Sequence, residues 1–168
     1  GIDAALTDRT ELPFEVAGAV KFPNQAQFHP LEFIRAISGQ LCIYEESKVI
    51  EVHDKRAKTA EGSVKADSIV VATHYPFIDT PGYYFMRMHQ ERSYVIALEN
   101  AAVLNGMYID GSGTGYSFRN YGELLLFGGE AHRSGKNPDG GRYQKLGEAA
   151  RNFYPECREK YRWSAQDC

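Results

Sequence analysis

The sequence predicts an α+β fold: an antiparallel sheet with a helix, preceded by a β-meander and another helix. Three strand-like runs, at 41–44, 48–52 and 57–64, predict the meander. Runs at 93–98 and 107–109 predict further strands, and those at 117–120 and 123–128 flank Tyr121-Gly122 and predict a hairpin. Only 30–39 and 143–154 repeat apolar residues at helical spacing.

Local signals set the bounds of these elements. Pro30 fits the first position of a helix and Gly39 ends it, whereas Pro155 stops the second helix. After the meander, the apolar residues Ile69–Ala72 predict a strand buried on both faces. Prolines and glycine at 76, 81 and 82 then mark a boundary. The chain is therefore expected to divide into four stretches: 1–25, 26–76, 77–160 and 161–168.

Composition excludes several function classes. The 168 residues carry a net charge of −3 without a block of like charges, which gives no support for a nucleic-acid or membrane partner. No apolar run approaches the roughly 18 residues of a membrane helix. The three cysteines are widely spaced and no histidine pair has ligand spacing, so neither a disulfide framework nor a metal site is predicted. A reducing, cytoplasmic setting is expected.

Several segments occur in an order that resembles FAD-dependent amine oxidoreductases of the D-amino-acid oxidase and glycine oxidase superfamily. The matching segments are Gln27–Pro30, Lys48–Val52, Asp67–Thr73, Tyr108–Ile109, Phe118–Arg119, Leu124–Gly129 and Trp163–Gln166. The resemblance implies hydride transfer from the α-carbon of an amine or amino acid to flavin N5. The resulting imine then hydrolyses, and the electrons pass to O₂ or another acceptor.

The resemblance also assigns the four stretches of the chain. Residues 1–25 would be a loop-rich lead-in from the substrate domain, and 26–76 part of the FAD-binding domain. Residues 77–160 would form the antiparallel sheet and helix of the substrate domain. Residues 161–168 would begin the return to the FAD domain.

Four candidate cofactor-binding residues follow from the same resemblance. Val49 would lie beside the adenine, and Ala72, Thr73 and His74 would come close to the FAD. The family usually has Gly where this chain has His74. Gly permits positive φ and close approach, whereas His adds a Cβ and a titratable ring. His74 is therefore either a structural residue at a strand end or a group that hydrogen bonds near the flavin.

Arg119 is the first candidate for substrate binding. It lies on a strand beside Tyr116 and Phe118, and a guanidinium pairs with a carboxylate through two parallel hydrogen bonds. The alternative is a surface arginine on a strand. Arg92 and Tyr94, at the start of the preceding strand, are further candidates. No catalytic residue is assigned.

The chain lacks the Gly-rich dinucleotide fingerprint, so we expect a piece of a longer polypeptide that is inactive in isolation. The segments Phe28–Phe33 and Trp163–Cys168 also resemble a bacterial subgroup in which a Rieske [2Fe–2S] domain follows the oxidoreductase. No Rieske Cys/His motif occurs in these residues. The alternative function is a stand-alone α+β module that binds a small molecule or a protein through a Tyr-rich sheet, without catalysis.

Overall fold

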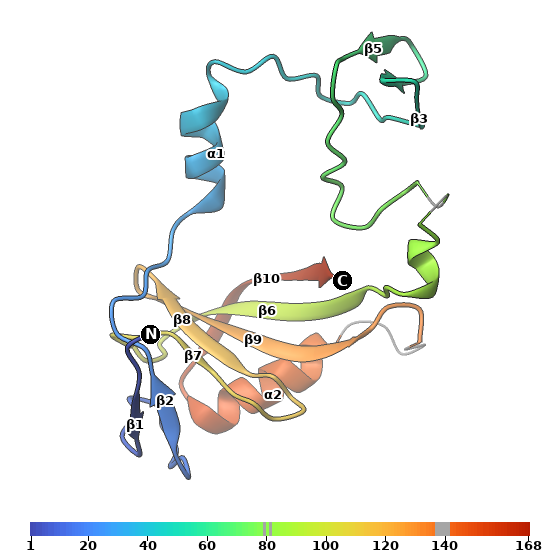
Figure 1. Ribbon diagram of the computed structural model, residues 1–168. Coiled ribbons are helices and arrows are strands. Elements are labelled where there is room, and N and C mark those ends of the chain that lie inside the picture. Colours follow the sequence, from blue (N-terminus) through green and yellow to red (C-terminus); the bar gives the residue numbers. More distant parts are fainter. Residues whose placement is uncertain (79, 81, 137–141) are drawn as a thin grey trace. The chain divides into compact units, whose positions relative to one another are not determined.

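The computed structural model divides the chain into two compact units, which are considered separately (Figure 1). It describes residues 1–78, 80, 82–136 and 142–168. Unit 1 contains Gly1–Ala5 and Lys21–Tyr84, and unit 2 contains Leu6–Val20 and Phe85–Cys168. Helices and antiparallel strands occur together in the chain, which confirms the predicted α+β class.

Unit 2 is built on a five-stranded antiparallel sheet with the order β10-β6-β9-β8-β7. The strands are β6 (Glu91–Glu99), β7 (Tyr108–Ile109), β8 (Ser117–Tyr121), β9 (Leu124–Arg133) and β10 (Arg158–Asp167). The predicted hairpin is confirmed: Tyr121 pairs with Leu124, and Gly122 takes a φ of 57° in the two-residue turn. Residues 161–167, expected to begin a return to the FAD domain, lie in β10 beside β6.

Helix α2 (Tyr143–Phe153) covers one face of this sheet (Figure 1). Its residues Leu146 and Ala150 are buried, and they belong to one core with Ile96, Phe118 and Phe127 of the sheet. Strand side chains alternate between the two faces, so every second residue of β6, β8 and β9 reaches this core. Burial of each large side chain contributes about 1.5–3 kcal/mol, and this helix–sheet packing therefore holds unit 2 together.

The lead-in of residues 6–20 is anchored to unit 2. The Phe14 ring lies 4.8 Å from that of Phe153 and 6.0 Å from that of Phe118, between centroids. The Glu11 carboxylate accepts hydrogen bonds of 2.7 Å from both the backbone and the side-chain amide of Asn105. At the ends of the lead-in, β1 (Ala5–Thr7) pairs with β2 (Ala19–Lys21).

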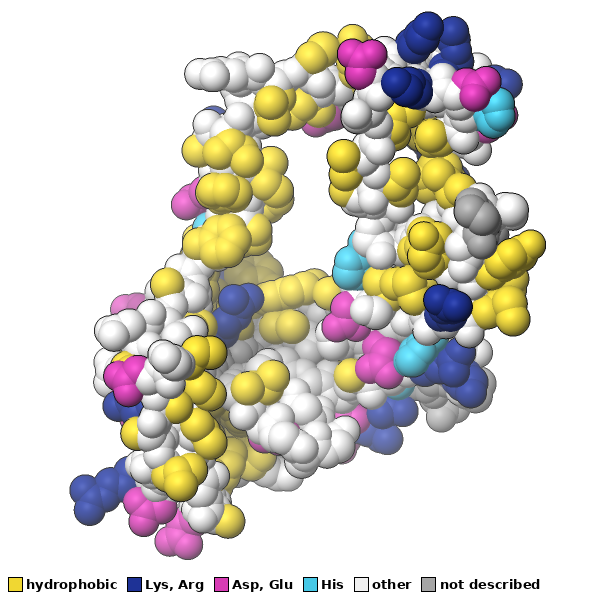
Figure 2. Space-filling model, viewed as in Figure 1, with side chains coloured by type: hydrophobic (Ala, Val, Ile, Leu, Met, Phe, Trp, Pro, Cys, Tyr) yellow, Lys and Arg dark blue, Asp and Glu magenta, His cyan; other side chains and the backbone are white. Residues whose placement is uncertain are grey.

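Unit 1 contains helix α1 (Pro30–Ser38), as predicted for 30–39. His29 caps it, because its Nδ1 accepts a 3.3 Å hydrogen bond from the Glu32 amide. Its apolar side chains remain exposed, and yellow side chains mark its surface in Figure 2. They include Leu31, Ile34 and Ile37.

Unit 1 contains a meander, but it begins later than predicted, and a turn at 59–62 divides the predicted strand 57–64 into two strands. Its strands are β3 (Glu51–His53), β4 (Arg56–Lys58) and β5 (Ser63–Lys65), in antiparallel order. Residues 41–44 form no strand. A two-residue connection at Asp54-Lys55 brings β3 and β4 together, whereas 41–44 has no ladder with any described segment.

The predicted strand at Ile69–Ala72 is wrong in this structure. These residues form no ladder, and Val70 is 86% exposed. A strand buried on both faces needs neighbouring strands and covering helices, and no described segment pairs with this one. A short 3₁₀ helix, η1 (Tyr84–Met86), follows farther along the chain. Within the described residues, no helix is both long and apolar enough to cross a membrane.

Candidate functional site

The two faces of the unit 2 sheet differ in what they carry. One packs against α2, and we call the other the helix-free face. Cross-strand pairing assigns seven central residues to it, since directly opposed residues point to the same side. They are Val95, Ala97, Ser117, Arg119, Leu126, Tyr161 and Trp163.

Arg119 is an exposed cation on the helix-free face. Its neighbour across β9 is Leu126, which is in turn opposed by Ala97 of β6. In the part of the chain that the structure describes, the Arg119 guanidinium makes no salt bridge and no side-chain hydrogen bond. All its donors are therefore available to an anion, which fits the predicted role in binding a carboxylate.

Tyr94 and Arg92 lie on the helix side of the sheet, away from Arg119. Tyr94 is 3% exposed, and its ring meets that of Tyr143 edge-on at 4.9 Å. Arg92 donates a 3.2 Å hydrogen bond to the Ser164 hydroxyl. The three predicted substrate residues are thus not brought together by the structure.

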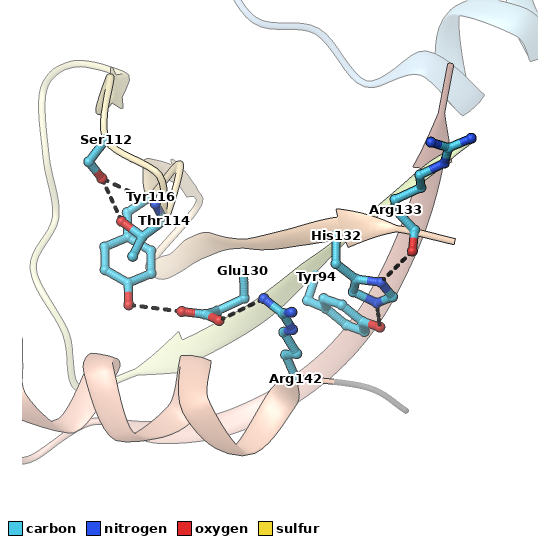
Figure 3. Close-up of polar contacts among 8 residues, drawn as sticks. All are labelled: Tyr94, Ser112, Thr114, Tyr116, Glu130, His132, Arg133 and Arg142. Carbon is cyan, nitrogen blue, oxygen red and sulfur yellow. Dashed lines mark hydrogen bonds and ion pairs between the residues drawn. The ribbon is translucent and has the colours of Figure 1, made fainter. Parts of the chain in front are cut away.

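Tyr94 is hydrogen bonded to a histidine that the sequence analysis did not single out. The Tyr94 hydroxyl lies 2.8 Å from Nε2 of His132, and Nδ1 of His132 lies 3.1 Å from the carbonyl oxygen of Arg133 (Figure 3). A carbonyl can only accept, so Nδ1 of His132 is the donor in that hydrogen bond, while Nε2 shares the second hydrogen bond with the Tyr94 hydroxyl. The pair fixes the end of β9 against β6.

A β-bulge near the same end of the sheet places Glu130 beside Tyr116 and Arg142. Two residues of β9, 130 and 131, oppose one residue of β6, and Glu130 has a φ of 57°. Its carboxylate accepts a 3.3 Å hydrogen bond from the Tyr116 hydroxyl and lies 3.7 Å from the Arg142 guanidinium (Figure 3). Burial, followed by the charge of Glu130, raises the pKa of Tyr116.

Gly129 is the sequence signal for this bulge. Its φ is 150°, and a Cβ there would lie 2.6 Å from the Tyr116 ring and 3.0 Å from the Thr114 carbonyl oxygen. The Glu130 amide donates a 3.0 Å hydrogen bond to that same carbonyl. The Gly128-Gly129-Glu130 segment therefore ties the 110–116 loop to β9, in agreement with the tight packing that glycines permit at a hairpin exit.

The cofactor candidates lie in unit 1. Val49 is half-buried just before β3, whereas Ala72, Thr73 and His74 are exposed. His74 has a φ of 63°, and a 2.7 Å hydrogen bond from the Tyr75 amide to the Thr73 carbonyl closes a γ-turn around it. This conformation is rare and strained for a residue with a Cβ. The position therefore has the backbone that Gly would favour, although His occupies it.

The comparisons with known proteins decide the family. The model of the family described as "FAD dependent oxidoreductase" matches residues 2–167. The chain belongs to this family of FAD-dependent oxidoreductases. The family resemblance inferred from the motifs is thereby confirmed.

A curated relative of this oxidoreductase chain is the "Putative Rieske 2Fe-2S iron-sulfur protein YhfW" of Bacillus subtilis (strain 168). It is 30% identical over 184 residues, an alignment that covers 99% of this chain and 36% of the relative. The chain thus spans about a third of the length of that relative. No solved structure matches the chain.

The residues of this oxidoreductase chain that would meet FAD fit that cofactor. The short side chains of Ala72 and Thr73 leave the backbone before His74 accessible, and residues 66–73 lie outside any described ladder. The positive φ at His74 suits a close approach between backbone and cofactor. The described residues offer no comparable site for a metal ion, because no three of their His, Cys, Asp or Glu side chains lie close enough together to bind one.

Proposed function

We propose that the natural protein containing this chain oxidises an amine or an amino acid with the help of FAD. The observation that supports the proposal most directly is Arg119, an exposed cation on the helix-free face that has no ion-pair partner among the described residues, in a chain of this family. A strand held between two neighbours is a rigid support for a binding residue. Bound FAD would supply the acceptor for the hydride and its two electrons.

In this proposal Arg119 binds and orients a substrate carboxylate. Its planar guanidinium forms two parallel hydrogen bonds, which fix both the position and the plane of the carboxylate. Ser117, on the same face two residues earlier, offers a hydroxyl to the same end of the substrate. Arg92 and Tyr94 are given no part in binding this carboxylate, because their side chains lie on the helix side of the sheet and Arg119 lies on the other side.

Unit 1 would contribute to the FAD site. Val49 is assigned to the adenine, and Ala72, Thr73 and His74 to the approach of the backbone toward the cofactor. The γ-turn at His74 supports this assignment, because strained backbone persists mainly where function requires it.

We also propose that a Rieske [2Fe–2S] domain belongs to the same natural protein and receives the electrons. The support is the name of the Bacillus subtilis relative, which is longer than this chain. A cytoplasmic location agrees with the three free cysteines, Cys42, Cys157 and Cys168.

A binding module without catalysis is the second candidate function. The exposed aromatic side chains of Tyr161 and Trp163 on the helix-free face favour it, since such residues are common at interfaces. This alternative predicts ligand binding with no turnover.

The deciding experiment uses the purified natural protein under anaerobic conditions. We expect the visible flavin absorption, and its loss when an amino-acid substrate is added. Arg119→Gln should raise KM for carboxylate-bearing amines roughly 10–100-fold and leave KM for amines without a carboxylate unchanged. The matched control is Arg158→Gln, which changes an exposed arginine at the start of β10 and should leave both KM values unchanged. A protein without flavin, or a flavin that no amine reduces, would contradict the proposal.

A further inference from the structure

The loop between β6 and β7 contains the only Asn-Gly pair of the chain, Asn105-Gly106. Asn105 is exposed and lies in a bend. A glycine in the second position leaves its own backbone nitrogen open to approach by the asparagine side chain, because glycine has no Cβ. We propose that Asn105 is a site of deamidation, that its contact with Glu11 controls the rate, and that the conversion weakens this contact.

The conversion requires only residues 105 and 106 and water. The backbone nitrogen of Gly106 attacks Cγ of Asn105, so that a C–N bond forms and the Cγ–Nδ2 bond breaks. The leaving nitrogen takes up the proton of the Gly106 amide and departs as ammonia. One water molecule then opens the five-membered succinimide, at one carbonyl to give aspartate or at the other to give isoaspartate. Among the described residues the Gly106 amide has no hydrogen-bond acceptor, so the attacking nitrogen is available.

The Glu11 carboxylate holds Asn105 away from this reaction. It accepts one hydrogen bond of 2.7 Å from the Asn105 backbone amide and another of 2.7 Å from Nδ2 of the same residue. The Tyr108 hydroxyl donates a third hydrogen bond, of 3.3 Å, to this carboxylate. Hydrogen bonds to an ionised acceptor are strong, and Nδ2 is bonded directly to the Cγ that must turn toward Gly106. The side chain therefore has to leave Glu11 before the ring can close.

The product is unsuited to the same contact. Deamidation replaces the donating Nδ2 by a carboxylate oxygen, and an ionised carboxylate can only accept. Two carboxylates at this distance repel each other when both are ionised. Isoaspartate also lengthens the main chain by one carbon, next to the backbone amide that donates to Glu11. Glu11 lies 94 positions away in the lead-in, so the conversion loosens residues 6–11, while Phe14 keeps its place against Phe153.

Asn120 provides a comparison within the same sheet. Its Nδ2 donates hydrogen bonds to the carbonyl oxygens of Ala102, at 3.0 Å, and of Leu124, at 3.3 Å. The residue that follows it is Tyr121, whose Cβ hinders the approach of the backbone nitrogen. Asn120 should therefore stay unconverted under conditions in which Asn105 reacts.

Peptide mapping by mass spectrometry tests the site in the natural protein, incubated in mildly alkaline buffer. We expect Glu11→Ala to raise the rate of conversion at Asn105 about tenfold, because two hydrogen bonds to a charged acceptor are lost. Glu15→Ala removes another exposed carboxylate of the lead-in and should leave the rate unchanged. Adding Gly106→Ala to Glu11→Ala should lower the rate about tenfold. A Cβ at 106 would lie 3.5 Å from the Tyr108 ring, an ordinary contact that the fold accommodates.

Limited proteolysis tests the consequence for the lead-in. Asn105→Asp reproduces the main charge change of the conversion, and Arg9 is an exposed trypsin site in the segment that should loosen. We expect cleavage after Arg9 to become roughly tenfold faster in Asn105→Asp. The control is Asn100→Asp, which introduces the same charge at an exposed position of the same loop. Its φ of 53° is a conformation that aspartate tolerates.

Each part of the inference has an outcome that overturns it. Equal rates of conversion in the wild type and Glu11→Ala would show that Glu11 does not control the reaction. Conversion of Asn105 no faster than that of Asn120 in Glu11→Ala would exclude the site. Equal cleavage of Asn105→Asp and Asn100→Asp would refute the effect on the lead-in, and this measurement decides the matter even where Glu11→Ala fails to fold.

Discussion

Units 1 and 2 use similar residues in opposite ways. In unit 2, apolar residues of β6, β8, β9 and α2 bury one another in a single core. In unit 1, the apolar residues of α1 are exposed, as are Val70 and Val71, and none of the buried hydrophobic residues of the described chain belongs to this unit. Both units nevertheless form regular elements.

The difference separates local from tertiary determinants of structure. Helix α1 is marked by local signals, which are Pro30 at its start and the His29 cap. The unit 2 sheet needs contacts between residues far apart in the chain, such as Ile96 with Phe127. Unit 2 should therefore respond strongly to loss of a core side chain, and unit 1 only weakly.

The largest effect is expected for Phe127→Ala. The Phe127 ring packs against those of Phe118 at 4.9 Å, Tyr116 at 5.0 Å and Phe153 at 6.0 Å. Its loss should lower the free energy of unfolding of unit 2 by about 3–5 kcal/mol. Hydrogen exchange of the β6 and β9 amides measures this change in the natural protein.

The matched variant in unit 1 is Ile34→Ala, on the exposed side of α1. It should change the local stability by less than about 0.5 kcal/mol. A loss of stability as large as that expected for Phe127→Ala would contradict the difference between the two units, because it would mean that α1 buries the Ile34 side in the natural protein.

A moderate effect is expected for Gly129→Ala. The new Cβ would meet the Tyr116 ring and the Thr114 carbonyl, at a φ of 150° that disfavours any Cβ. We expect unit 2 to lose more than about 1 kcal/mol of stability, measured by thermal unfolding. Gly113→Ala is the control, since nothing lies within 4 Å of a Cβ there. Equal stability of the two variants would refute a structural role for the bulge.

The smallest effect concerns the pH dependence of the loop at 110–116. Burial by itself would raise the pKa of Asp110, but hydrogen bonds from Ser112 and Thr114 outweigh it and lower the pKa below its ordinary 3.8. A lowered pKa means that the carboxylate stabilises the loop above about pH 4, and that this contribution is lost as the pH falls through the folded-state value. Proteolysis of the loop should therefore rise in acid. Asp110→Asn should remove this pH dependence, and a persistent dependence would assign it to another group.

Sequence patterns predicted elements whose signals are local. The start of α1, the turn at Gly122 and the end of α2 before Pro155 follow from residue types at fixed positions. The prediction of a strand at 69–72 was wrong because an apolar run indicates only a preference for burial. A β-ladder also requires a neighbouring strand, and no described segment pairs with this one. The meander began later than predicted because residues 41–44 pair with no described strand, and the predicted strand 57–64 is divided because the chain turns between Thr59 and Gly62.

The candidate site was only partly predictable for the same reason. Arg119 could be proposed from its residue type and from the family resemblance. The separation of Arg119 from Tyr94 depends on cross-strand register, which the alternation of a single strand does not reveal. The Tyr94–His132 hydrogen bond joins residues that are 38 positions apart in the sequence, so no local sequence pattern predicts it.

The lead-in has a consequence for how the protein is made. Phe14 emerges from the ribosome long before Phe153, whose ring it packs against. At typical rates of synthesis the interval is on the order of ten seconds. During that time the early segment stays exposed to solvent and to chaperones, and unit 2 can complete its core only after α2 has been translated.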